Sequence, residues 1–184
     1  MKIPLRLFLL VILSESLGHA AWARSPEETL VAYVEAVKKD GMSASVRFMH
    51  PGEMAAFREE LEPEIQRRLK DSRTRQRFSS FADPYHMKQM RPFKDDADFM
   101  VSFIKWMIND GAMSVSTFQN AEVKPLGVVP EGDLRHVVAR FHFSSGKQAS
   151  ENVTVTSMKM DGAQPMLQLL PELKQVAAFV RAPQ

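Results

Sequence analysis

The hydrophobic pattern of this chain changes its period once, near residue 121, and this change limits the fold more than any other feature. Up to Gly111, apolar residues recur every three or four positions, which is the spacing of amphipathic helices. After Ala121 the chain consists of β-prone runs separated by turn signals. Helices followed by strands with short connections predict an α+β domain, in which an antiparallel meander buries one face against the helices.

The predicted helices have explicit start and stop signals. Ser25, Pro26 and Glu28 form a capping box with proline at the first helical position. Gly41 predicts a left-handed cap at the end of this first helix. Later helices are bounded by proline, aspartate and glycine signals. We expect helices from Ser25 to Gly41, from about Ser43 to His50, from about Glu53 past Pro63 and Phe78 to Asp83, and from Asp95 to Gly111.

Four β-prone runs follow, and Gly-containing turn sequences separate them. Consecutive strands with short connections predict a curved antiparallel sheet of about four strands. Pro171-Glu172 then predicts a short C-terminal helix with Leu173, Val176, Ala177 and Val180 at core spacing. The predicted strands are Val123–Val129, Arg135–Phe143, Asn152–Met160 and Met166–Leu170, and the turns are Pro130–Asp133, Ser144–Gly146 and Asp161-Gly162.

The first 23 residues have the composition of an export signal. Lys2 and Arg6 precede an unbroken apolar run from Leu7 to Leu13, and Ala21-Trp22-Ala23 offers the small residues that a signal peptidase recognises. A membrane-spanning helix needs about 20 mainly apolar residues, so the run is too short to be an anchor. The sequence predicts a signal peptide over residues 1–23, cleaved after Ala23, and a periplasmic or secreted protein without stable membrane insertion.

Composition limits the chemistry of the rest of the chain. The sequence has no cysteine, which excludes disulfides, thiolate metal sites and a cysteine nucleophile. Its 24 basic and 22 acidic residues give a formal net charge of +2, whereas a nucleic-acid binder carries a strong basic excess on one face. Residues 24–184 are enough for one domain and short for two. We therefore expect a single domain with no cofactor, no metal ion and no nucleic-acid partner.

In the cone-shaped NTF2-like fold, helices come first in the chain and an antiparallel meander that curls over them follows. Together with the capped start at Ser25, the segments that carry the comparison are Leu126-Gly127-Val128-Val129-Pro130-Glu131-Gly132-Asp133, His136-Val137-Val138-Ala139-Arg140 and Met49-His50-Pro51. On these segments the chain resembles exported bacterial NTF2-like proteins of uncharacterised function. The resemblance implies helices over the concave face of a sheet, with a modest pocket between them. The wider superfamily includes isomerases, dehydratases, small-molecule binders and scaffolds, so it implies no single activity.

Alternation along the strand predicted over Arg135–Phe143 separates a core face from a polar face. The core face carries Val137, Ala139, Phe141 and Phe143, and the opposite face carries His136, Val138, Arg140 and His142. Two imidazoles around a guanidinium could hold an anionic ligand or form a pH-sensitive contact. The favoured interpretation is a solvated or subunit-contact face, because antiparallel sheets commonly keep one face wet. His136, Arg140 and His142 are thus the candidate ligand or interface residues.

A run of basic residues on the predicted third helix is a second candidate surface. Such a run could bind an anionic surface or partner protein, although most cationic runs on helices are solvated. Phe78 and Phe81 fit the apolar side of the helix better than a role in base stacking. The candidate residues are Arg67, Arg68, Lys70, Arg73, Arg75 and Arg77.

The chain's 12 methionines raise a copper hypothesis. Thioethers and imidazoles are soft ligands, and His86, Met87 and Met90 are close in sequence. Methionine is also an ordinary core filler, which is the favoured interpretation here. It predicts core positions for Met100, Met107, Met158 and Met166.

The catalytic residues stay unassigned, because the sequence has no nucleophile elbow, no His-Glu-x-x-His pair and no phosphate-binding glycine loop. The first hypothesis is a non-enzymatic binding or interaction domain for a small apolar or amphiphilic ligand, or for a protein partner. The first alternative is an acid–base enzyme of the isomerase or dehydratase type, with an inward-facing histidine or aspartate in the cone pocket. The second alternative is a homodimeric interaction protein that pairs through the outer face of its sheet.

Overall fold

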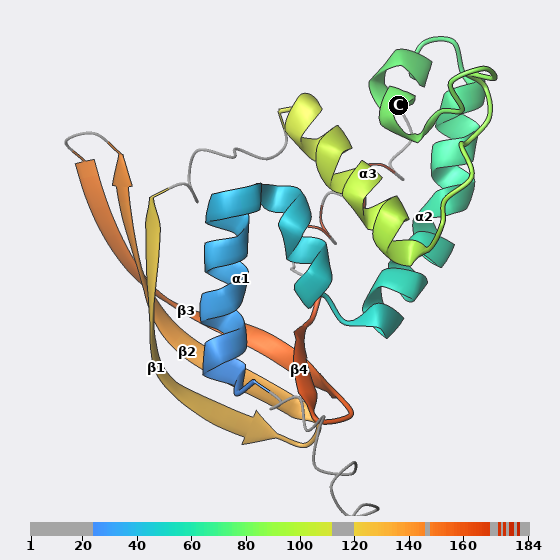
Figure 1. Cartoon of the computed structure of the whole chain (residues 1–184). Helices are drawn as coiled ribbons and strands as arrows, with labels where there is room; N and C mark the ends of the chain where they lie inside the picture. The colour runs from blue at the N-terminus through green and yellow to red at the C-terminus, as the bar shows by residue number, and fades with distance from the viewer. Residues whose placement is uncertain are drawn as a thin grey trace, which may run out of the picture.

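A computed structural model of the chain describes residues 24–111, 120–145 and 148–169, together with residues 173, 175, 177, 178 and 180. The predicted signal peptide lies outside these residues. Within them the fold is α+β, as predicted (Figure 1). The elements are α1 (Pro26–Asp40), η1 (Met42–Phe48), α2 (Pro51–Lys70), η2 (Arg75–Phe81), α3 (Asp96–Asn109), β1 (Ala121–Glu131), β2 (Leu134–Ser145), β3 (Gln148–Asp161) and β4 (Gln164–Leu167), where η marks a 3-10 helix.

Helix α1 begins at the predicted capping box. The backbone N–H of Glu28 donates to the Ser25 hydroxyl over 3.1 Å, and the Glu28 carboxylate accepts from the Ser25 N–H over 2.8 Å. The helix ends at Gly41, whose N–H donates to the Val37 carbonyl. Gly41 has a φ of 80° but a ψ of 175°, so the predicted left-handed helical cap is wrong, although the positive φ still favours glycine.

Helix α2 differs from its prediction at both ends. It begins at Pro51, where the His50 ring accepts a hydrogen bond from the Gly52 N–H over 3.1 Å and acts as the N-cap. It continues through Pro63 and ends at Lys70 rather than beyond Phe78. Side chains that follow the helix bind its last carbonyls and so replace the next turn. Arg75 donates to the Leu69 and Lys70 carbonyls, and the Thr74 hydroxyl donates to the Arg68 carbonyl.

The four strands form one antiparallel meander in the order β1-β2-β3-β4. Gly132 and Gly162 have φ values near 60° in the turns before β2 and β4, as the turn sequences predicted. The register of β1 shifts between Pro125 and Gly127, which marks a β-bulge. Strand β4 pairs with β3 only over the stretch from Met158 to Asp161. The predicted turn at Ser144–Gly146 extends beyond the described residues.

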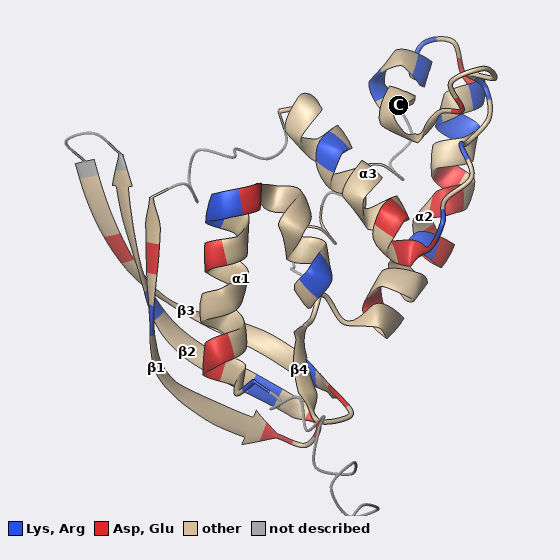
Figure 2. Cartoon of the chain, viewed as in Figure 1, with Lys and Arg blue, Asp and Glu red and all other residues tan. Residues whose placement is uncertain are grey.

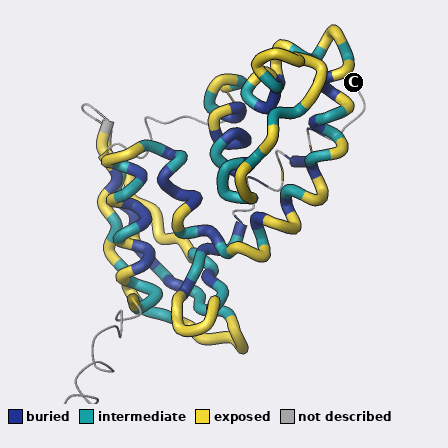
Figure 3. Tube along the Cα trace, turned by 45° about the vertical axis from the view of Figure 1, so that its right-hand side comes forward, coloured by how far each residue is buried: buried dark blue, intermediate teal, exposed yellow. Residues whose placement is uncertain are grey.

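The helices form two groups around one hydrophobic core. Helix α1 lies against the concave side of the sheet, whereas α2, η2 and α3 pack on one another and contact the α1 region through η1 (Figures 1 and 3). Residues predicted to be in the core come from both helix groups and from the sheet, and they form one buried cluster. This cluster includes Leu30, Leu61, Phe103, Val137 and Met158. Among the helices that the structure describes, α1 covers the inner face of the sheet and none lies on the other face.

The C-terminal helix was predicted from Pro171, a region that lies mostly outside the described residues. Leu173, Ala177 and Val180 are described, and all three are buried in the main core cluster. The Arg68 guanidinium donates to the Val180 carbonyl over 2.9 Å. The end of the described chain is therefore tied to α2.

Candidate functional site

The outer face of the sheet, which is the face turned away from α1, carries the candidate strand residues. Val137, Ala139 and Phe141 are buried on the inner face and Phe143 packs partly against the core, so the predicted alternation is confirmed. Residues directly opposite each other on antiparallel strands share a face. His142 lies between Glu122 of β1 and Glu151 of β3, and Arg140 lies between Lys124 and Val153. The outer face is therefore built from cross-strand rows.

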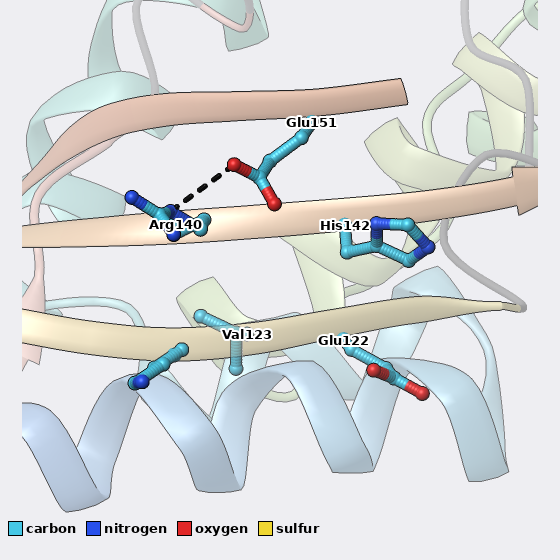
Figure 4. Close-up of a pocket in the computed structure, with 6 residues that line it drawn as sticks. Glu122, Val123, Arg140, His142 and Glu151 are labelled. Atoms are coloured by element: carbon cyan, nitrogen blue, oxygen red, sulfur yellow. Dashed lines mark ion pairs between the residues drawn. The ribbon is translucent and has the colours of Figure 1, made fainter. Parts of the chain in front are cut away.

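Two of these rows line an open groove (Figure 4). The Arg140 guanidinium Nε lies 3.2 Å from a Glu151 carboxylate oxygen, and both side chains are about half exposed. The groove contains two carboxylates, two cations and one imidazole, so it offers no surplus of either charge. Its lining residues are Glu122, Val123, Lys124, Arg140, His142 and Glu151.

His136, the third strand candidate, belongs to a different cluster. Its Nδ1 lies 2.9 Å from the Ser157 hydroxyl, and its Nε2 lies 2.8 Å from a Glu131 carboxylate oxygen. Val138 separates His136 from Arg140 along the same face. The structure thus brings Arg140 and His142 together in one groove and places His136 at the other end of the outer face.

The outer face also carries an exposed apolar strip, which runs from Val153, opposite Arg140, to Val129, opposite His136. Leu126 at the β1 bulge is 48 % exposed and Val129 of the same strand is 55 % exposed. Val153 and Val155 of β3 are 58 % and 61 % exposed. Val138 lies between them, because it pairs with Gly127 on one side and with Val155 on the other. We refer to Leu126, Val129, Val138, Val153 and Val155 as the apolar strip.

The basic residues of the helical region mostly have internal partners. Arg67 donates two hydrogen bonds to Glu64, Arg73 bonds to Asp71, and Arg77 forms an ion pair with Asp110. Acidic residues predominate along α2 up to Glu64, and basic residues gather in its last turn (Figure 2). Lys70 is exposed, and Arg75 binds the end of α2.

Arg68 corrects the expectation of a solvated basic face. Its side chain is only 4 % exposed, and it bonds to Glu64 as well as to the Val180 carbonyl. Phe78 and Phe81 are buried, as predicted from their positions on the apolar side. The run from Arg67 to Arg77 is thus largely a structural network, and its binding of an anionic partner stays a prediction.

Hydrogen bonds lower the pKa of three carboxylates in the helical region. Hydrogen bonds from Arg67 and Arg68 lower the pKa of Glu64 below its ordinary value of 4.5. Hydrogen bonding from Arg91 lowers the pKa of Asp98 below 3.8. The hydrogen bond from the Arg73 backbone N–H is the main cause of the lowered pKa of Asp71. In all three cases the hydrogen bonds stabilise the charged carboxylate, which is the effect expected of structural contacts.

Three of the four methionines with predicted core positions are buried. Met100, Met107 and Met158 are buried and Met166 is half-buried, so the core interpretation is confirmed for the first three. Among the described residues, no group of three histidine, aspartate or glutamate side chains is arranged to hold a metal ion. No described helix is both long and apolar enough to cross a bilayer.

Comparison with known proteins gives no match among family models, curated proteins or solved structures. The NTF2-like resemblance therefore stays a prediction, and the site has to be argued from its own geometry. Sequence reasoning missed the β1 side of the groove, Glu122 and Lys124, and also missed the apolar strip. The register of β1 and β2 can be counted from their turn at Gly132. This count places Lys124 opposite Arg140 only when the bulge after Pro125 is included.

Proposed function

We propose that the chain is an exported, non-enzymatic interaction domain that binds a protein partner through the outer face of its sheet. The observation that carries the proposal is the apolar strip, in which Leu126, Val129, Val153 and Val155 are exposed and Val138 is half-buried. Such residues are most often buried. Contiguous exposed apolar patches with polar rims are typical of interaction sites. The strip has such a rim at both ends.

The charges around the strip favour a protein over other partners. Glu122, Lys124, Arg140 and Glu151 stand at one end of the strip, so neither sign dominates. Nucleic acids and anionic membranes are bound by surfaces of one sign. Protein interfaces combine an apolar centre with a rim of mixed polar groups.

The open form of the groove favours an interface over a small-molecule site. Small-molecule sites are concave, mostly apolar and largely closed to solvent, whereas Arg140 and Glu151 in the groove are about half exposed. Acid–base catalysis also needs a base in a water-poor setting. The small-ligand and enzyme hypotheses stay predictions that no described contact favours.

Substitution of the strip tests the proposal. Val129→Asp places a charge within the apolar strip, and Val31→Asp is the matched control because Val31 is an exposed valine on α1. Native mass spectrometry of the protein purified after export is expected to show a second protein at fixed stoichiometry. Val129→Asp is expected to reduce its occupancy at least about tenfold, since a buried unpaired charge costs more than about 1.4 kcal/mol, and Val31→Asp should not.

Two results would contradict the proposal. One is a wild-type protein that carries no protein partner under conditions that preserve weak complexes. The other is equal loss of the partner in the two variants, which would show a general effect of added charge. Circular dichroism of both variants checks that each remains folded.

A further inference from the structure

The outer edge of β1 and the part of β3 that β4 does not cover differ in their protection against pairing with another chain. Strand β1 carries Pro125 and Pro130 and a bulge between Pro125 and Gly127. Proline and bulges are devices that keep an edge strand from pairing with another chain. Over residues 148–156, β3 has no proline, no lysine and no bulge, and its register with β2 is continuous.

This part of β3 is an unpaired edge within the part of the chain that the structure describes. Strand β4 covers β3 only from Met158 to Asp161, and the Gln168 N–H binds the Ser157 carbonyl over 3.1 Å. The β2–β3 hairpin extends well beyond β4 (Figure 1). A free edge of nine residues, 148–156, therefore remains.

Backbone geometry shows which residues offer hydrogen bonds to that edge. In an antiparallel strand, the N–H and C=O of one residue point to the same side and those of the next residue point to the other side. The Met160 N–H donates toward β2, to the Asp133 carbonyl, whereas the Ser157 carbonyl faces β4. Because the register is unbroken, the odd-numbered residues face outward. These are Ala149, Glu151, Val153 and Val155.

We propose that this edge pairs with the same edge of a second copy of the chain, antiparallel and across a two-fold axis at Asn152. The position of the axis follows from the limits of the edge, because residue 152 is the midpoint of 148–156. A centre closer to Asp161 would push each copy against β4 of the other, and a centre closer to Gln148 would shorten the pairing. The proposal goes beyond a partner on the outer face, since it concerns backbone pairing at an edge. It would join two four-stranded sheets into one.

The side chains of the edge are compatible with such self-pairing. In this register Glu151 lies opposite Val153 of the second copy, and Ala149 lies opposite Val155. On the other face Ser150 lies opposite Thr154, and Asn152 meets its own equivalent. No like charges are directly opposed, and Arg140 of the same chain pairs with Glu151.

A second copy is favoured over a flexible peptide as the occupant. An already folded edge strand has little conformational entropy to lose on pairing, whereas a flexible segment must be ordered first. A second copy also supplies a strand of equal length with the same outward N–H and C=O groups. Extension of the sheet would place the valines of both copies on one continuous outer face.

Disulfide trapping tests the register directly, because the chain has no cysteine of its own. In the proposed dimer the two Asn152 residues form a non-hydrogen-bonded pair, whose Cα atoms lie about 4.5 Å apart, within the range for a disulfide. Asn152→Cys is therefore expected to form a covalent dimer under mild oxidation. Thr154→Cys is the matched control, since its equivalents would be about 13 Å apart and should react at least about tenfold more slowly.

A charge pair at Val153 tests the same contact without cysteine. Val153→Glu would face Glu151 of the second copy, whereas Val153→Lys would form an ion pair with it. Sedimentation of the exported protein over a concentration series is expected to show dimers for the wild type and for Val153→Lys, with at least about fivefold weaker association for Val153→Glu. Val153 is exposed, so both variants should fold, and circular dichroism checks this.

Several outcomes would overturn the proposal. A protein that stays monomeric throughout the series, with both cysteine variants reacting equally slowly, excludes the edge dimer. Faster crosslinking of Thr154→Cys than of Asn152→Cys excludes the proposed axis. Dimers that Val129→Asp disrupts and Val153→Glu does not would show pairing through the outer face instead. The proposed partner binding fails separately, if Val129→Asp leaves a bound protein in place.

Discussion

The arginines of α2 and η2 and the outer face of the sheet are both conspicuous, but the structure treats them in opposite ways. Arg67, Arg68 and Arg77 have carboxylate partners within the same chain. On the outer face, Val153 and Val155 are more than half exposed and cover nothing. The comparison teaches that a dense run of charged residues can form an internal network of ion pairs, whereas a few valines in a strand can form an exposed apolar surface.

Among the charged side chains, Arg68 gives the largest expected effect, and its substitution tests whether the helical network is structural. Arg68→Met removes the bonds to Glu64 and to the Val180 carbonyl, and it leaves that carbonyl without its buried donor. Loss of a buried charged hydrogen-bond donor is expected to lower the free energy of unfolding by about 2–4 kcal/mol. Urea unfolding followed by circular dichroism measures the change.

Arg67→Met is the matched control for Arg68. Arg67 bonds to the same carboxylate, but its side chain is 58 % exposed. We expect no resolvable change in the unfolding midpoint, because exposed ion pairs contribute little. If Arg67→Met and Arg68→Met destabilised the protein equally, the burial of Arg68 would not explain its contribution to stability.

The Arg91–Asp98 ion pair at the start of α3 gives a smaller expected effect, on the stability of the protein in acid. Arg91 donates two hydrogen bonds to Asp98 and one to the Ser102 hydroxyl, and its guanidinium lies 4.2 Å from the centre of the Phe93 ring. Since the pKa of Asp98 is lowered in the folded state, its stabilising contribution is present above pH 3.8 and is lost as the pH falls through the folded value. Arg91→Gln should therefore flatten the fall in unfolding free energy between about pH 5 and pH 2.

Urea unfolding at several pH values measures this slope. Asp98→Asn should flatten it in the same way, because the variant has no carboxyl group to titrate at that position. An unchanged slope in both variants would show that Asp98 does not contribute to acid unfolding.

The sequence predicted most element starts because their signals are local. Ser25 caps α1, and Asp95 accepts from the Asp98 N–H at the start of α3, each within a few residues. The end of α2 was missed, since it depends on Arg75 bonding to the Leu69 carbonyl six residues earlier. No periodicity of apolar residues encodes such a contact.

The candidate site was predictable only within one strand. Alternation places His136, Arg140 and His142 on one face of β2, because side chains in a strand alternate with a period of two residues. Their partners come from other strands and depend on register. The bulge after Pro125 decides that Lys124, rather than a neighbour, lies opposite Arg140. The exposure of Val153 and Val155 was also hidden, because valine in a strand usually indicates core.

Substitution of Arg140 tests the outer face of the sheet, and we expect a small effect. Arg140→Ala removes an ion pair with Glu151 in which both side chains are about half exposed, so the free energy of unfolding should change by no more than about 0.5 kcal/mol. Phe141→Ala is the control on the adjacent residue, because Phe141 is buried and its loss should cost about 3–5 kcal/mol. If Arg140→Ala instead unfolded the protein as readily as Phe141→Ala, the outer face would be a structural layer, and a partner would not be needed to explain its polar ends.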